Sequence, residues 1–401
     1  MRRRAGQFLL IGPIMKRKNR VEALFNEKGN FDAFITKSPA DIAYLIGITF
    51  PYPDQSTFSA ALVAKRGSSV GTLILPVEWE CVLRSFTWEG KTKTYSINDG
   101  SPKTAFCNAL KSVIDELGIC HDKVAVDYSW WRVGEIRFLK ENCPDMYIID
   151  LDPTIQAARE IKSEYEIENI QKAAHIADRG IIGALNHIEG TVGYSNCTVS
   201  NFLEHVRIHA IEFGANTIGH LNIARGRSGN SLITPIYDLK VIKENKTLRV
   251  DYSLSYNGCW TVCSRMLYTG KPGPNTAHAF AQNKLLKDFA VSILKPGIRV
   301  CEFCEAVRLK ADDEDIEMLY DEGMGHGVGA SEYEKPYLTP DNEEVLRTGM
   351  VIALDVKTIG YKDELIHSVD IYELTSDGNR RLSDFRDCDT LYRINGVRSS
   401  L

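Results

Sequence analysis

The 401-residue sequence has no long apolar run, no internal repeat, no low-complexity segment and no large excess of one charge. Since a bilayer-spanning helix needs about 20 apolar residues, we expect no membrane segment and no membrane partner. A formal net charge of −5 argues against a general nucleic-acid binder. The basic N-terminal stretch encloses an apolar run too short for a signal peptide, so residues 1–14 are predicted to be an unstructured extension, with Met15 as an alternative start.

The ten cysteines show no pattern of a disulfide framework. Most lie singly in apolar or mixed segments, and without a signal peptide we expect reduced thiols in a cytoplasmic protein. The pair Cys301 and Cys304 has metal-ligand spacing and is expected in the first turn of a helix. A zinc or redox role needs a second ligand pair or a thioredoxin-like context, and the sequence has neither.

Hydrophobic residues make up 44% of the chain and charged residues 25%, which is typical of a globular protein of two or three domains. Short apolar strands alternate with helical patterns in residues 15–155, and this alternation predicts an α/β domain. The predicted strands are 31–36, 59–65, 72–76, 124–128 and 146–151, and a helix is predicted over 103–117.

A second domain is predicted over residues 160–401. Ser163 and Glu166 form a capping-box pattern that begins a long amphipathic helix. From residue 247 polar and apolar side chains alternate, and the turn at 256–258 predicts a hairpin whose return strand brings a residue near 262 beside Asp251. Further strands are predicted at 349–356 and 367–375.

Four segments of this second half resemble the pita-bread family, which includes creatinase, aminopeptidase P and prolidase. They are IKSEYEIENIQKAAHIADRG (161–180), VDYSLSYNGCWTVCSRMLYTG (250–270), GMGHGVGASEYEKP (323–336), and GMVIALDV (349–356) with SVDIYELTSDG (368–378). The resemblance implies an α/β creatinase-like N-terminal domain and an α+β pita-bread domain with a cleft over a curved antiparallel sheet. It also implies a homodimer.

In the active peptidases of this family, two aspartates, a histidine and two glutamates hold two metal ions. Such ions need anionic oxygens, and bridging carboxylates hold them together. The matching positions in this sequence are Asp251, Val262, His326, Asp355 and Val369. Both bridging carboxylates therefore fall on valines, and we expect no dinuclear site and no cofactor.

A metal site of another composition is the alternative. Manganese, cobalt or zinc would be held by Asp251, His326, Asp355 and Asp370, which follows Val369 directly. A shift of one residue along a strand reverses the face that a side chain occupies, which argues against Asp370. Lys357, two residues after Asp355, could instead form a salt bridge to it.

Accessory positions of the family are also changed. The resemblance places Tyr333 where the enzymes have a second, substrate-contacting histidine, and Glu334 beside it is retained. Thr234 stands nearest to the acid/base histidine of creatinase. His220 is a candidate base from an upstream segment, and His367 is expected in a solvated turn.

Three hypotheses follow for the function. The first is a ligand-binding pseudoenzyme that takes a peptide or small molecule in the cleft lined by remnant positions. The second is a metal-independent hydrolase of a C–N bond, as in creatinase, with His326 or His220 as base. The third is an Xaa-Pro aminopeptidase or dipeptidase with an atypical metal site. Convergent ligands around one point would favour the third, and a histidine beside a second acid the second.

Overall fold

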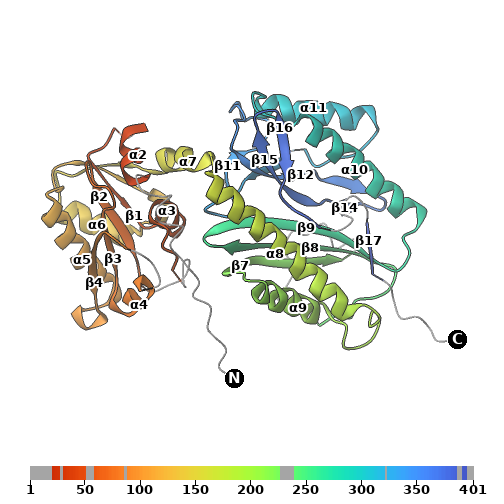
Figure 1. Ribbon diagram of the computed structural model, residues 1–401, viewed down its shortest axis with the longest axis horizontal. Coiled ribbons are helices and arrows are strands. Elements are labelled where there is room, and N and C mark those ends of the chain that lie inside the picture. Colours follow the sequence, from red (N-terminus) through yellow and green to blue (C-terminus); the bar gives the residue numbers. More distant parts are fainter. Residues whose placement is uncertain are drawn as a thin grey trace, which may run out of the picture. The chain divides into compact units, whose positions relative to one another are not determined.

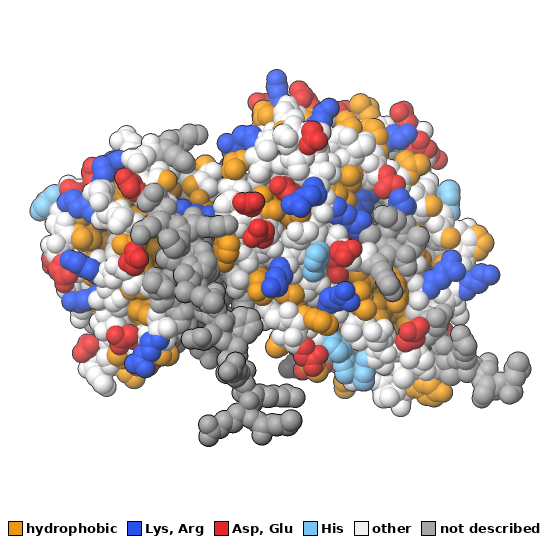
Figure 2. All heavy atoms as spheres, in the orientation of Figure 1, with side chains coloured by type: hydrophobic (Ala, Val, Ile, Leu, Met, Phe, Trp, Pro, Cys, Tyr) orange, Lys and Arg blue, Asp and Glu red, His pale blue; other side chains and the backbone are white. Residues whose placement is uncertain are grey.

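The computed structural model describes residues 20–27, 30–50, 58–84, 88–225, 239–320, 323–385 and 391–394. The predicted extension at 1–14 lies outside these residues. The chain divides into two compact units, residues 1–159 and 160–401 (Figure 1). No helix in the described ranges is long and apolar enough to cross a membrane. Acidic and basic side chains are interspersed on the face shown in Figure 2.

The first unit is an α/β domain built on a six-stranded mixed sheet in the order β4-β3-β2-β1-β5-β6. Its strands are β1 (Ala33–Thr36), β2 (Ala61–Lys65), β3 (Thr72–Pro76), β4 (Lys91–Tyr95), β5 (Lys123–Val126) and β6 (Tyr147–Asp150). Its helices are α2 (Arg20–Glu27), α3 (Pro39–Ile46), α4 (Glu80–Leu83), α5 (Pro102–Leu117), α6 (Val133–Asn142) and α7 (Asp152–Glu160). The predicted α/β class is confirmed, and β4 is a strand that the sequence patterns missed.

Helix α5 shows why the sequence forms these elements where it does. The Ser101 side chain accepts a hydrogen bond from the backbone N–H of Thr104, and Pro102 occupies the first turn, where its missing N–H costs no helical bond. Gly118 ends the helix at a φ of 63°, a left-handed conformation that glycine adopts without strain. The helix predicted over 103–117 is thus confirmed.

One cysteine prediction is wrong. Cys120 and Cys143 form a disulfide, with their Cα atoms 5.1 Å apart. The sequence separation of 23 residues gave no local pattern for this pair, because the loop after α5 and the end of α6 meet only in the folded domain. Cys301 and Cys304 are both free thiols and lie in the first turns of a helix, as predicted.

The second unit is built on a strongly curved, mainly antiparallel sheet in the order β11-β10-β12-β15-β9-β8-β7, with β16 beside β15 and β17 beside β9. Its main strands are β7 (Thr217–Arg225), β8 (Thr247–Tyr256), β9 (Cys259–Thr269), β10 (Gly325–Gly327), β11 (Glu334–Tyr337), β12 (Val351–Asp355) and β15 (Val369–Thr375). The remaining strands are β13 (Thr358–Gly360), β14 (Glu364–Ile366), β16 (Gly378–Arg381) and β17 (Tyr392–Ile394). Its helices are α8 (Glu164–Ile188), α9 (Val199–Glu212), α10 (Pro274–Ile293) and α11 (Val300–Asp313) (Figure 1).

Two predicted local structures of this unit are confirmed. Ser163 and Glu166 form the capping box that begins α8. The turn at Asn257 and Gly258, with φ of 50° and 75°, joins β8 and β9 into a hairpin.

The helices cover one face of the curved sheet. Alternate residues of β8, such as Val250 and Tyr252, pack with α8 and α9 in one apolar cluster. Ile352 and Leu354 of β12 pack with α10 and α11 in another. Because successive residues of a strand point to opposite faces, the residues between them lie on the other face, which we call the inner face.

Candidate functional site

The strand register brings the predicted site positions together on the inner face. Asp251 of β8 pairs with Ser264 of β9, which also pairs with Val369 of β15. Val369 in turn pairs with Asp355 of β12. Directly paired residues share a face, so these four side chains form one row across four strands.

The other two predicted positions lie on the same face. Val262 precedes Ser264 by two residues along β9. His326 of β10 pairs with Ala353, which precedes Asp355 by two residues along β12. Val262 and Val369 are only 9% and 8% exposed and belong to one buried apolar cluster. The centre of the site is therefore apolar.

Asp355 is held by two basic side chains. The carboxylate contacts His367 Nδ1 at 2.7 Å through Oδ1 and Lys357 Nζ at 2.9 Å through Oδ2. Burial alone would raise the pKa of Asp355, but the His367 and Lys357 charges and hydrogen bonds outweigh it and hold that pKa below its ordinary value. The salt bridge predicted between Lys357 and Asp355 is confirmed.

Asp251 has an equivalent set of partners. Arg249 Nε donates to its Oδ2 at 2.7 Å, and the Ser264 hydroxyl donates to its Oδ1. His367 Nε2 lies 3.5 Å from the same Oδ1, beyond a well-formed hydrogen bond, and finds no hydrogen-bond partner among the described residues. The imidazole of His367 thus stands between the two carboxylates of the site.

The expectation that His367 lies in a solvated turn is wrong, since the residue is only 4% exposed. His367 directly precedes β15 and lies two residues before Val369. Period-two alternation with Val369 could have placed it on the inner face. The charged neighbours Asp363 and Glu364 instead favoured the prediction of a solvated turn.

His326 lies at one side of the row. Its Nδ1 is 2.9 Å from the backbone oxygen of Gly327, and its ring centroid is 3.9 Å from that of Tyr333. Burial lowers the pKa of His326, so the neutral imidazole is favoured at neutral pH. Tyr333 is 59% exposed and also stacks on Tyr337, which makes it an aromatic surface beside the site.

Glu334, which the resemblance places with Tyr333 and Thr234 in the ligand cleft, lies in an ion pair. The carboxylate is buried, and its Oε1 lies 2.9 Å from Nζ of Lys162, itself a buried ammonium. This ion pair joins the residues before α8 to strand β11. The ion pair gives this carboxylate a structural partner within the second unit. Thr234 lies outside the described residues.

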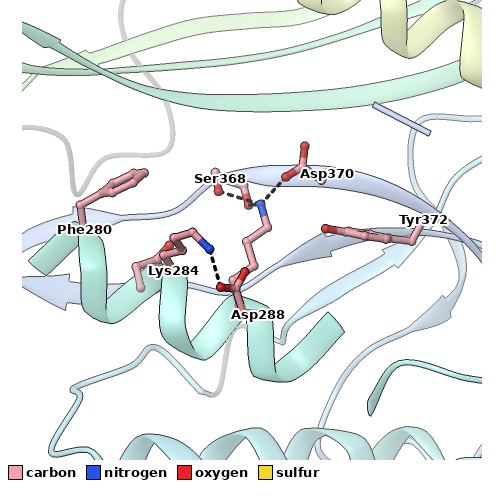
Figure 3. Close-up of a pocket in the computed structure, with 8 residues that line it drawn as sticks. Phe280, Lys284, Asp288, Ser368, Asp370 and Tyr372 are labelled. Atoms are coloured by element: carbon pink, nitrogen blue, oxygen red, sulfur yellow. Dashed lines mark hydrogen bonds and ion pairs between the residues drawn. The ribbon is translucent and has the colours of Figure 1, made fainter. Parts of the chain in front are cut away.

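Asp370 lies on the opposite face from Val369 and cannot complete a metal site with Asp251 and Asp355. Its Oδ1 is 3.1 Å from both Arg265 Nη2 and Arg381 Nη2, and its Oδ2 accepts from Lys287 Nζ on α10. Figure 3 shows Asp370 and Ser368 on the strand above this helix. The reversal of facing expected for a one-residue shift is confirmed, and the alternative ligand set does not converge.

His220 of β7 contacts Glu332 on the inner face, and the sequence patterns did not predict this contact. Its Nδ1 lies 3.1 Å from Oε2 of Glu332, in the loop between β10 and β11. The hydroxyl of Ser253 donates to the same oxygen. Glu332 follows a glycine-rich loop with no periodicity, and no local pattern marks it as part of the site.

Comparison with known proteins agrees with this architecture. Residues 168–382 match the model of metallopeptidase family M24, and residues 17–161 match the creatinase/prolidase N-terminal domain. An Xaa-Pro dipeptidase of Pyrococcus horikoshii is 24% identical over 372 residues, which cover 92% of this chain and 97% of that protein.

Solved structures show the same fold at low identity. An X-Pro aminopeptidase from Thermotoga maritima superposes with a TM-score of 0.77 at 18% identity, covering 94% of this chain and 99% of the other. The N-terminal domain of a FACT complex subunit from chickpea (Cicer arietinum) gives a TM-score of 0.69 at 13% identity, covering 95% and 99%. The matched regions, the curved sheet and its covering helices together establish that this chain belongs to metallopeptidase family M24, with a creatinase/prolidase N-terminal domain.

Proposed function

We propose that this chain binds a peptide or a peptide-like small molecule at the inner face without the two metal ions of a metallopeptidase. The observation that carries the proposal is His367, which stands between Asp251 and Asp355. Together with Arg249 and Lys357 it gives these two carboxylates, which metal ions would otherwise bind, partners from the chain itself.

The donor set does not fit a two-metal centre. Valine has no donor atom, and both bridging positions, Val262 and Val369, lie in an apolar cluster. The two remaining carboxylates already have basic partners. Among the described residues, no three His, Cys, Asp or Glu side chains are arranged to hold a metal ion. A cation entering here would have to displace lysine, arginine or histidine from buried carboxylates.

Metal content tests the proposal directly. After incubation with manganese, cobalt or zinc and extensive washing, we expect background metal by elemental mass spectrometry, and the same for Asp251→Ala. A family peptidase with an intact ligand set serves as the positive control. Near-stoichiometric metal that is lost in Asp251→Ala but kept in Asp288→Ala, a change at an exposed pair on α10, would overturn the proposal and favour an atypical peptidase.

A metal-independent hydrolase is the second candidate, because His220 Nδ1 lies 3.1 Å from Glu332 Oε2. A carboxylate can orient such an imidazole as a general base. This candidate predicts turnover of amidine or amide substrates in chelator-treated buffer, lost by 100-fold or more, on the order of a general-base contribution, in His220→Ala. His205→Ala, in a histidine of helix α9, is the control. No turnover by the wild type leaves the binding protein as the remaining proposal.

A further inference from the structure

The carboxylate of Glu332 is held on the inner face by side chains of two neighbouring strands. Its Oε2 accepts from Ser253 on β8 and lies beside His220 on β7. Gly219 makes the approach possible, because a Cβ there would lie 2.2 Å from Ser253 Oγ and 2.8 Å from Glu332 Oε2. The same point is 3.0 Å from the ring of Trp260. A side chain larger than glycine would push the carboxylate away.

Glu332 differs from the other acids of the site in its ion-pair partner. Asp251, Asp355 and Glu334 each form an ion pair with an arginine or a lysine. Within the described part of the chain, Glu332 has no such partner, and its ion-pair contact is with His220. The hydrogen bond from His220 is the largest influence on the pKa of Glu332 and lowers it, so the carboxylate is ionised at neutral pH.

Two aromatic residues are neighbours of Glu332. Trp260 lies beside it over Gly219, and Tyr333 is the next residue in the chain. Tyr333 is exposed, and its ring stacks on that of Tyr337 and meets that of His326 at a tilt. An ionised carboxylate beside immobilised aromatic faces is the arrangement that recognises organic cations, through a charge-assisted hydrogen bond and cation–π contact.

We propose that Glu332, flanked by Tyr333 and Trp260, binds a primary ammonium group of the ligand. Oε2 already has two protein partners, so Oε1 is the oxygen left to accept from a ligand. A guanidinium group pairs most strongly through both carboxylate oxygens, whereas an ammonium group needs only one. The inference rests on the proposed function, since it assigns the charge of a ligand bound at the same face.

The ammonium group could belong to a peptide amino terminus or to a lysine side chain, and three probes separate these sources. Alanyl-phenylalaninamide carries a free amino terminus. N-acetyl-lysyl-phenylalaninamide carries only a side-chain ammonium. N-acetyl-alanyl-phenylalaninamide has neither charge. All three share the phenylalaninamide group, and each probe is compared between wild type and variant, so a change in affinity reports on its contact with Glu332.

The test is calorimetric titration of each probe into metal-free wild type, Glu332→Gln and Glu343→Gln, an exposed acid in the same unit. We expect Glu332→Gln to weaken at least one charged probe by about 10- to 100-fold, the size of a hydrogen bond to a charged group. The neutral probe should bind Glu332→Gln and wild type alike, and Glu343→Gln should bind all three probes like wild type. Which charged probe responds identifies the source.

Three further variants test the role of the Tyr333 ring and the positioning of Glu332. Tyr333→Phe should keep charged-probe affinity and Tyr333→Leu should lose it, since only the ring face contacts the cation. Gly219→Ala should reproduce the loss of Glu332→Gln by displacing the carboxylate. Equal charged-probe affinity in wild type and Glu332→Gln, or no charged-probe binding by wild type, overturns the inference. Probe binding that requires added metal overturns the proposed function instead.

Discussion

Asp370→Ala should lower the free energy of unfolding of the second unit by about 3–5 kcal/mol, the cost of removing one partner from a buried ion pair. The carboxylate is 2% exposed and contacts Lys287, Arg265 and Arg381. Its loss removes this carboxylate from all three cations, and only Arg265 keeps its contact with Asp178, at 2.8 Å. Denaturant unfolding followed by circular dichroism measures the difference.

The matched control is Asp288→Ala on the same helix as Lys287. Asp288 pairs with Lys284 four residues away on the exposed face of α10, and such pairs contribute at most about 0.5 kcal/mol. If Asp370→Ala does not fold, Asp370→Asn keeps the shape and removes the charge. An Asp370→Asn variant as stable as Asp288→Ala would mean that the buried network contributes little.

Wild type and Asp370→Ala should also differ in how their stability responds to acid. Burial raises the pKa of Asp370, but the three cations outweigh it and hold that pKa below its ordinary value of about 3.9. A carboxylate with a depressed folded-state pKa stabilises fully above the unfolded pKa and loses this contribution as pH falls toward the folded value. The stability gap between wild type and variant should therefore shrink below about pH 4.

Local patterns in the sequence were sufficient for much of this fold. The capping box at Ser163, the turn at Asn257 and the alternation around Asp251 depend on neighbours within a few residues, and all three are found as predicted. Strand register then explains why Asp370 turns away, since facing follows from a period of two.

The chemistry of the site could not be predicted in the same way. His367 acquires its role only because β8, β9, β15 and β12 align Asp251 with Asp355, and three long-range pairings separate those residues. Glu332 meets His220 across 112 residues of sequence. Contacts of this kind depend on tertiary packing, for which propensity and periodicity carry no signal.

Restoring the missing acids should restore metal binding. The triple variant Val262→Asp, Val369→Glu and Lys357→Ala returns both bridging carboxylates and removes an ammonium that competes for Asp355. Without metal the new buried carboxylates lack partners, so the variant should be less stable than wild type. With manganese, the five side chains at the family's ligand positions can share the ions on the inner face.

The measurement is the melting temperature with and without manganese, together with metal content. Metal at 100 times its dissociation constant adds about 2.7 kcal/mol of stability per site. In a unit of this size that corresponds to roughly 5–10 °C in melting temperature. The wild type should not respond. The matched control is Val262→Asn, Val369→Gln and Lys357→Ala, which has the same shape and no added charge.

The two possible outcomes show whether the spacing of the ligand positions or the basic partners of the carboxylates controls metal binding. A response of the acidic variant alone means that the backbone still holds the ligand positions at metal-binding spacing and that Val262 and Val369 are what exclude the ions. If the acidic variant folds but takes up no more metal than the amide control, the remaining basic partners of Asp251 and Asp355, rather than the two valines, exclude the metal. Arg249 and His367 would then hold Asp251 and Asp355 tightly enough to exclude metal even when both bridging acids are present.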